Sequence, residues 1–268
     1  MNRNRFDKPD RKGLSSLPAD VFVVEGLAAV REYLRHRPRM VVKALCKRDS
    51  ERSLRASLQE LDCSAVPVEL LPDDADPSAA TAPVWAHVRH QTGDEKNFIE
   101  RLAGRDTDLV VALDHVTDPR NVGAIVRTAA FFGVKDVLAP ERRQGLITPA
   151  SVATAQGGFA LCDLVKVVNL NRVLDKMKEA GYWIVGTDMD GDPIESCQKN
   201  FGKTVIVMGS EDAGMSAGIR KACDLIVRIG TGAAGGGLES LNVSVAAGIF
   251  IHAFSPGKTT RSSLDKPT

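Results

Sequence analysis

The second half of the chain alternates short apolar runs with segments of helical periodicity, and this alternation restricts the fold more than any other feature. Strands that alternate with helices form parallel sheets whose two faces are both covered by helices. The expected strands are 109–113, 134–138, 164–168, 182–187, 203–208 and 225–229. The expected helices are 121–132, 149–156, 170–180, 215–222 and a last one that begins near Val243. We therefore predict an α/β fold built on a parallel sheet.

The first part of the chain shows a shorter pattern of the same kind. Strands are expected at 21–24, 40–46 and 66–71, and helices at 26–37 and 53–61. This order predicts a compact α/β domain of roughly 80 residues. Residues 72–83 are rich in proline and aspartate and predict a loop, and the polar segment 93–105 predicts a linker. The basic segment 1–17 and the polar segment 256–268 are expected to be flexible tails.

The overall charge excludes little, because 35 Lys and Arg residues nearly balance 34 Asp and Glu residues over 268 residues. A surface that binds nucleic acid would therefore have to come from local clustering. The five cysteines are odd in number and contain no C-x-x-C pair, which predicts reduced thiols. There is no apolar run of 18 residues and no signal peptide, so we expect a cytoplasmic protein without a membrane segment.

A glycine-dense loop, 230–239, separates the last expected strand from the last expected helix. Its start, GTGAAG, fits the G-x-G-x-x-G pattern of dinucleotide sites. That interpretation needs an acidic residue about 20 positions later to bind the ribose. After Glu239 the next carboxylate is Asp265, in the polar tail, and no further strand–helix unit follows. A nicotinamide enzyme therefore stays a weak alternative. We expect the loop to be poorly ordered without a ligand.

The last expected helix is apolar on nearly every side. A helix of this kind must be covered on more than one face, so it belongs to a core or an interface. Its apolar residues are Val243, Val245, Ala246, Ala247, Ile249, Phe250 and Ile251.

Three sequence blocks follow expected strand ends, where ligands of parallel sheets bind. Residues 118–129 read DPRNVGAIVRTA, residues 207–215 read VMGSEDAGM, and residues 240–246 read SLNVSVA. In this order and at these separations, the blocks resemble the three motifs of the SpoU/TrmH family of RNA ribose 2′-O-methyltransferases, in the SPOUT superfamily. The resemblance extends over roughly residues 108–254.

The resemblance implies an architecture as well. Residues 106–255 would form a methyltransferase domain with a C-terminal trefoil knot, in which the last segment passes through an earlier loop. Residues 18–105 would be a linker and a small domain similar to the ribosomal protein L30e, which binds the RNA substrate. The family also implies a homodimer, and the apolar last helix independently requires a second surface.

The activity that the resemblance implies is methylation of a ribose 2′-hydroxyl in structured RNA, with S-adenosyl-L-methionine as cofactor. The RNA-binding domain favours 23S ribosomal RNA, with a guanosine as the expected nucleotide. Transfer RNA is the alternative substrate. A catalytically inactive RNA-binding module of the same fold is a further alternative, but the motif residues are all present.

The second and third motifs would hold the cofactor. Carried over from the family, the contacting residues are Met208, Gly209, Gly214, Ile229 and Leu241. Glycine lets the backbone approach a ligand closely because it has no Cβ. The chain departs from the family at Gly230, where a proline is usual, and its following loop is longer. This departure puts the fit of that loop to the cofactor in question.

The expected catalytic residues are Arg127, Asn121, Glu211, Ser240 and Asn242. Arg127 projects from an apolar helix, and a guanidinium stays protonated, so it would clamp the target phosphate and stabilise the forming alkoxide. Asn121 is expected at a helix start. Glu211 is either part of the site or a charge at a helix start. Ser240 and Asn242 could bind substrate, orient the arginine or cap the last helix.

Two patterns suggest metal sites but lack ligands. His87 and His90 are spaced for a metal pair on a helix, without an upstream Cys, Asp or Glu at ligand spacing. Residues 188–192, DMDGD, resemble the start of a calcium loop, but Pro193 and Lys199 occupy the positions of the required Gly and Glu. We therefore predict no metal, and a solvated turn at 188–192.

Overall fold

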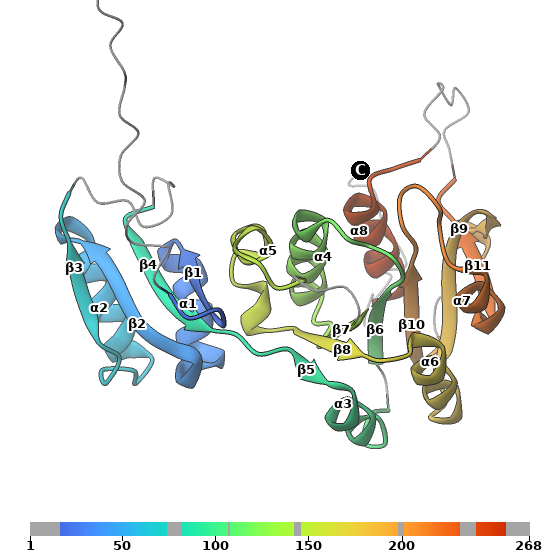
Figure 1. Cartoon of the computed structure of the whole chain (residues 1–268), viewed down its shortest axis with the longest axis horizontal. Coiled ribbons are helices and arrows are strands. Elements are labelled where there is room, and N and C mark those ends of the chain that lie inside the picture. Colours follow the sequence, from blue (N-terminus) through green and yellow to red (C-terminus); the bar gives the residue numbers. More distant parts are fainter. Residues whose placement is uncertain are drawn as a thin grey trace, which may run out of the picture. The chain divides into compact units, whose positions relative to one another are not determined.

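The computed structural model describes residues 17–73, 82–106, 108–141, 146–197, 201–230 and 240–255. The chain divides into two compact units, Met1–Gln91 and Thr92–Thr268 (Figure 1). The predicted tails lie outside the described residues except for Leu17, which packs against the core of the first unit. The glycine loop after Gly230 also lies outside them, so its predicted disorder stays a prediction.

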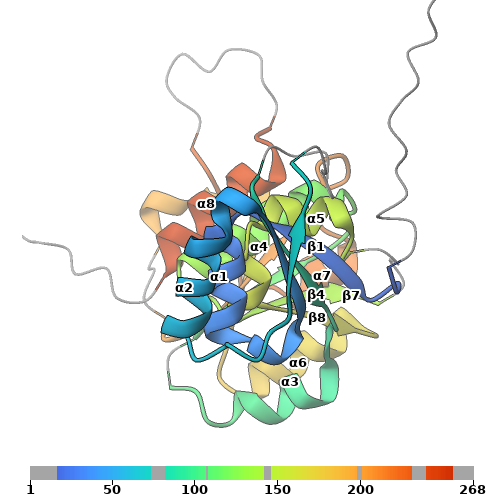
Figure 2. The same ribbon diagram turned by 90° about the vertical axis from the view of Figure 1, so that its left-hand side faces the viewer.

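The first unit is a four-stranded mixed sheet with two helices on one side of it (Figure 2). The strand order is β1-β4-β2-β3, in which β4 pairs antiparallel with β1 and β2 while β2 pairs parallel with β3. The strands are β1 (Val21–Glu25), β2 (Val41–Lys47), β3 (Val68–Leu71) and β4 (Val84–Arg89). The helices are α1 (Leu27–His36) and α2 (Glu51–Glu60), with short turns η1 (Pro38–Met40) and η2 (Arg48–Ser50).

Strand β4 is absent from the sequence prediction, and its position corrects the interpretation of the two histidines. His87 lies in this strand rather than on a helix, and burial lowers the pKa of its imidazole. His90 follows the strand, with Nε2 2.5 Å from the Tyr33 hydroxyl. The strand lies between β1 and β2 and is buried on both faces, so its sequence is a nearly continuous apolar run rather than an alternating one.

The second unit contains a seven-stranded sheet in which every strand pairing is parallel, as predicted. The order is β11-β9-β10-β6-β7-β8-β5. The strands are β5 (Gly93–Asp94), β6 (Asp108–Leu113), β7 (Asp136–Pro140), β8 (Asp163–Val167), β9 (Trp183–Pro193), β10 (Lys203–Met208) and β11 (Leu225–Arg228). The helices are α3 (Glu95–Leu102), α4 (Pro119–Phe131), α5 (Pro149–Ala155), α6 (Leu170–Glu179), α7 (Ala217–Ala222) and α8 (Val243–Phe254), with short turns η3 (Gly158–Ala160) and η4 (Ile194–Ser196).

Helices cover both faces of this sheet (Figure 1). Successive side chains of a strand point to opposite faces. In β6, Val110 belongs to the core shared with α3, α6 and α7, while the neighbouring residues face the other layer. That other layer contains α4, α5 and α8, and α8 packs against α4, β10 and β6. Helix α8 therefore lies over the strands that precede the first two motifs.

Two segments of the second unit differ from the prediction. Residues 93–105 are not a plain linker, because Gly93 and Asp94 pair with β8 and the next residues form α3, which buries Phe98 and Leu102. Residues 188–192 belong to β9 rather than to a turn. The pairing with β11 jumps from Gly186 to Asp192, so the residues between them bulge out of the ladder. A run of polar residues can therefore continue a strand when that part of the strand is unpaired.

A buried carboxylate connects α3 to the sheet, and its removal is expected to destabilise the second unit. Asp136 is 1% exposed and accepts hydrogen bonds from Arg101 and Arg105, each at 2.7 Å. Asp136→Ala leaves the half-buried Arg105 short of one partner, so we expect a loss of about 3 kcal/mol in the free energy of unfolding by urea. Glu100→Gln, in an exposed pair on the same helix, should cost less than about 0.5 kcal/mol. Equal losses would contradict the assignment.

The five cysteines are all free thiols, as the sequence predicts, and three of them are buried. Within the described parts of the chain, none of the helices combines the length and the apolar character needed to cross a bilayer.

Candidate functional site

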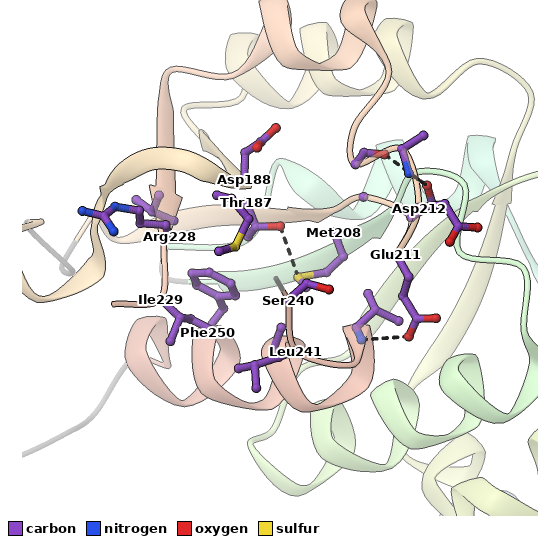
Figure 3. A pocket seen from close by; sticks show the side chains of 18 of the residues that line it. Thr187, Asp188, Met208, Glu211, Asp212, Arg228, Ile229, Ser240, Leu241 and Phe250 are labelled. Atoms are coloured by element: carbon purple, nitrogen blue, oxygen red, sulfur yellow. Dashed lines mark hydrogen bonds between the residues drawn. The ribbon is translucent and has the colours of Figure 1, made fainter. Parts of the chain in front are cut away.

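A cavity of about 630 Å³ opens at the carboxyl ends of β10 and β11, next to β9 and α8 (Figure 3). It lies where ligands of parallel sheets bind. All five residues predicted to hold the cofactor line this cavity: Met208, Gly209, Gly214, Ile229 and Leu241. The sequence therefore located the cavity correctly, although the role of each residue toward a ligand stays a prediction.

One wall of the cavity is apolar. Ile229 at the end of β11 and Phe250 and Leu241 from α8 and its approach lie close together (Figure 3). Val243, Ala246 and Met208 are further apolar residues of the cavity lining. An apolar cavity of this size with a few polar groups suits a small heteroaromatic ligand.

The opposite side is a closed turn of the backbone. Ser210 and Gly214 exchange two backbone hydrogen bonds of 3.0 Å, and the Ser210 hydroxyl accepts from the N–H of Ala213. Gly214 has φ +65°, a conformation that favours glycine. A Cβ on Gly209 would lie 2.3 Å from the carbonyl carbon of Gly214. The turn can therefore close only if residue 209 is glycine.

Gly209→Ala is expected to open this turn and to weaken ligand binding. The added methyl group would meet backbone atoms, which cannot move aside without breaking the hydrogen bonds of the turn. We expect at least about a tenfold weaker affinity for the cavity's ligand in calorimetry. Gly104→Ala is the matched control, because a Cβ there meets no atom within 4 Å. Unchanged binding in Gly209→Ala would show that the turn does not shape the site.

Glu211 brings the three sequence motifs together. Its Oε1 accepts from the Asn242 Nδ2 at 2.8 Å, the Val243 N–H at 3.1 Å and the Asn121 Nδ2 at 3.2 Å. Asn242 Nδ2 also donates to the Asn121 Oδ1 at 3.1 Å. We call Asn121, Glu211 and Asn242 the motif cluster. Three of the five predicted catalytic residues thus lie in direct contact.

The residues of the motif cluster also lie at the N-termini of α4 and α8. Asn242 caps α8, since its Oδ1 accepts from the Ser244 N–H at 2.9 Å, and the Glu211 carboxylate lies at the positive end of the same helix. Asn121 lies in the first turn of α4, as expected, but the capping residue there is Asp118. Ser240 lines the cavity just before the cap.

Arg127 is the one predicted catalytic residue that belongs neither to the cavity lining nor to the motif cluster. Asn121 and Asn242 do not line the cavity themselves, but they contact Glu211, which does. Among the described residues, the lining does not include Arg127, whose side chain is exposed on α4. It lies six residues after Asn121, and a turn of 100° per residue places the two on different sides of the helix. The same helix and its neighbour α8 carry exposed apolar residues, since Phe131 of α4 is 83% exposed, and Val245 and Ile249 of α8 are 53% and 38% exposed.

Several residues at the site escaped the sequence prediction. Asp114 follows β6, is 3% exposed, and accepts from the Ser216 N–H at 2.6 Å. Its own N–H donates to the Met208 carbonyl, so it fixes the strand ends beneath the motif loops. Thr187, Asp188 and Arg228 also line the cavity. Their position in the sequence could have identified them, since each lies at the end of an apolar strand run or directly after one.

The fold and the cavity together define the class of protein. It is an α/β protein with a parallel sheet and a ligand-sized cavity at the carboxyl edge of that sheet. Comparison with known proteins then gives the family. The model of the SpoU rRNA Methylase family matches residues 108–252, which is more than half of the chain and includes all three motifs. The chain belongs to this family, and the resemblance seen in the motifs is confirmed.

Curated relatives of the chain are described as tRNA/rRNA methyltransferases. The chain is 43% identical over 143 residues to an "Uncharacterized tRNA/rRNA methyltransferase" of Mycobacterium sp. (strain KMS), over 53% of this chain and 45% of the relative. It is 36% identical over 162 residues to a protein of the same description from Archaeoglobus fulgidus, over 60% of this chain and 70% of the relative. The chain thus matches about half the length of the mycobacterial relative.

Solved structures show the same architecture over most of the chain. The SpoU methyltransferase AviRb from Streptomyces viridochromogenes, in complex with AdoMet, is 25% identical with a TM-score of 0.72, over 88% of this chain and 90% of that chain. An AdoMet-bound rRNA methyltransferase from Sinorhizobium meliloti is 19% identical with a TM-score of 0.70, over 88% and 87% of the two chains. At 19% identity, the similarity to the Sinorhizobium meliloti structure is evidence for the fold alone.

Proposed function

We propose that this protein transfers a methyl group from S-adenosyl-L-methionine to a ribose 2′-hydroxyl of RNA. The observation that carries the proposal is that the second and third motifs line one cavity, and that the Glu211 carboxylate of this lining joins them to Asn121 of the first motif. Membership of the SpoU family and the likeness to a structure crystallised with AdoMet support the choice of cofactor.

The cavity fits this cofactor in size and in chemistry. Its volume of about 630 Å³ lies within the usual range for sites of small ligands. Ile229, Leu241 and Phe250 offer an apolar wall for the adenine, and the turn from Gly209 to Gly214 offers backbone groups. When bound, the cofactor supplies an electrophilic methyl group on a positively charged sulfur. The described residues contain no cluster of His, Cys, Asp or Glu suited to a metal ion.

We assign different roles to Glu211 and Arg127, the two charged residues among the predicted catalytic residues. Glu211 Oε1 already accepts three N–H groups, so its role is to position Asn121 and Asn242 rather than to take the proton of the substrate. Asn121, Asn242 and Ser240 can then bind the ribose next to the cavity. Arg127 stabilises the charge that develops on the attacking oxygen and holds the neighbouring phosphate.

We propose that the protein works as a homodimer through the exposed apolar surface of α4 and α8. Arg127 is exposed on α4 and is not among the described residues that line the cavity of its own chain. Pairing two copies through this surface would cover Phe131, Val245 and Ile249. It would also let Arg127 of one copy serve the cavity of the other.

A charged substitution in this surface is expected to separate the dimer. Val245→Glu combined with Ile249→Glu places two carboxylates in an apolar contact, so light scattering after size exclusion should give the mass of one chain. Val168→Glu is the control, because Val168 is 63% exposed, follows β8, and donates its N–H to Glu95 of α3. A dimer that survives the double substitution would place the interface elsewhere.

The remaining assignments follow the family. We propose that the first unit, Met1–Gln91, is an L30e-like domain that binds the RNA and that the second unit is the methyltransferase domain. We also propose the trefoil knot, which the return of α8 from the edge strand β11 to β10 and β6 supports. Ribosomal RNA, in particular a guanosine of 23S RNA, is the preferred substrate, and the reaction takes place in the cytoplasm.

The test is transfer of tritium from labelled cofactor to RNA isolated from a strain that lacks the gene. We expect label in ribosomal RNA and, after digestion, in a 2′-O-methylated nucleoside identified by mass spectrometry. Purified transfer RNA is the parallel arm, and label there alone would favour the alternative substrate. Absence of label in both RNAs, or label on a base, would contradict the proposed reaction.

A further inference from the structure

A carboxylate from β9 forms part of the cavity wall, and the family motifs do not include it. Thr187 and Asp188 line the cavity opposite the apolar side formed by α8 (Figure 3). The Thr187 hydroxyl is already used, since it donates to the Val207 carbonyl at 3.0 Å. Asp188 lies beside the glycine turn, with Oδ2 3.7 Å from the position of a Cβ on Gly214. It is therefore the charged group of this wall.

Arg220 of α7 holds Asp188 in place. Its Nη1 donates to the Asp188 Oδ2, and its Nη2 donates to both carboxylate oxygens of Asp190 at 2.8 and 2.9 Å. One guanidinium thus serves two carboxylates, and the group of three keeps a formal charge of −1. Asp190 is the more exposed partner, at 68% of its side chain against 27% for Asp188, and it is outside the cavity lining.

The described lining as a whole is acidic. It contains the carboxylates of Asp188, Glu211 and Asp212 against the guanidinium of Arg228. Glu211 is engaged by three N–H donors, and Asp212 is exposed. Asp188 is partly buried, and a charge in such a position is screened less by water than one on the surface.

We propose that Asp188, held by Arg220, recognises the positive charge of the methyl donor and so distinguishes the donor from its product. The inference rests on the proposed function. The donor carries a sulfonium, whereas S-adenosylhomocysteine, which remains after the methyl group has left, has a neutral sulfur. A fixed carboxylate stabilises only the charged form, so the site would bind the donor tightly and release the product readily.

The test is calorimetry with both ligands on three forms of the whole protein. Asp188→Asn keeps the shape of the side chain and removes its charge, so we expect about a tenfold loss of affinity for S-adenosylmethionine. Affinity for S-adenosylhomocysteine should change by less than about twofold, and this also shows that the cavity remains folded. Asp190→Asn, which removes the other carboxylate of the same arginine, should leave both affinities unchanged.

Other outcomes overturn the inference. An equal loss for both ligands would mean that Asp188 binds a part that they share, such as the ribose hydroxyls. No change for either ligand would remove Asp188 from the site. If Asp190→Asn lost as much affinity for S-adenosylmethionine as Asp188→Asn, the effect would come from the position of Arg220 and not from the charge of Asp188. Binding of neither ligand by the wild type would refute the proposed function itself, which separates that failure from this one.

Discussion

Replacing Arg127 with alanine is expected to lower kcat by about 10²–10³-fold while the affinity for S-adenosylmethionine stays within about twofold. The reason is the position of the side chain, which is exposed on α4 and does not line the cavity. We therefore expect it to act on the RNA and on the developing charge rather than to hold the cofactor bound to its own chain. The measurement combines single-turnover methyl transfer with calorimetry.

The matched control for Arg127→Ala is Lys176→Ala. Lys176 is an exposed cation on α6, whose core residues pack on the opposite face of the sheet from α4 and α8. Its removal should leave kcat unchanged, which excludes a general effect of positive charge on RNA binding. If Arg127→Ala kept full kcat, or lost cofactor affinity as well, the proposed role would be wrong.

Mixing two inactive variants tests whether Arg127 serves the site of the other copy. A dimer of one Arg127→Ala chain and one Glu211→Ala chain contains one site with both residues intact only if Arg127 acts across the interface. Random exchange of subunits should then restore about a quarter of the wild-type activity. Action within one chain predicts no recovery.

Glu211→Ala is expected to lower kcat/KM by about 10²-fold, because Asn121 and Asn242 lose the acceptor that fixes them and small misplacements are costly. Glu211→Gln keeps an oxygen that can accept these hydrogen bonds but removes the charge. We expect a loss of about tenfold for this variant. The difference in kcat/KM between the two variants measures how much the hydrogen-bonded geometry of the motif cluster contributes. The loss that remains in Glu211→Gln measures the contribution of the charge.

Asp212→Asn is the control for Glu211. Asp212 is adjacent in sequence, lines the same cavity and is exposed. Its substitution should change kcat/KM by less than about threefold, because Asp212 is not part of the motif cluster and a surface charge by itself contributes little. If Asp212→Asn were as harmful as Glu211→Ala, the loss would reflect the overall charge of the cavity and not the hydrogen bonds of the motif cluster.

The sequence predicted the parallel sheet of the second unit because its strands are buried on both faces and form nearly continuous apolar runs. Strand β4 is also buried on both faces, but it was not predicted. Its apolar run includes His87 and follows a segment rich in proline and aspartate. The acidic run 188–192 predicts a turn by composition, and nothing local shows that β11 changes register opposite it. Both errors concern pairing between distant strands, which local composition does not encode.

The site was predicted in part because strand ends and motifs coincide. Residues that follow neighbouring parallel strands must meet at one edge, and the five residues predicted to hold the cofactor do line one cavity there. The contacts of Glu211 with Asn121 and Asn242 cross between separate elements, so sequence left its role open. The position of Arg127 could not be predicted fully. Helical spacing separates it from Asn121 but does not indicate which surface of the domain it faces.

The most direct test of this account is a crystal structure of the protein with S-adenosylhomocysteine. We predict that the ligand lies in the cavity between the Gly209–Gly214 turn and the apolar wall of Ile229, Leu241 and Phe250. The motif cluster should border the ligand without being displaced by it. A ligand bound elsewhere on the chain, with this cavity left empty at saturating concentration, would contradict the account.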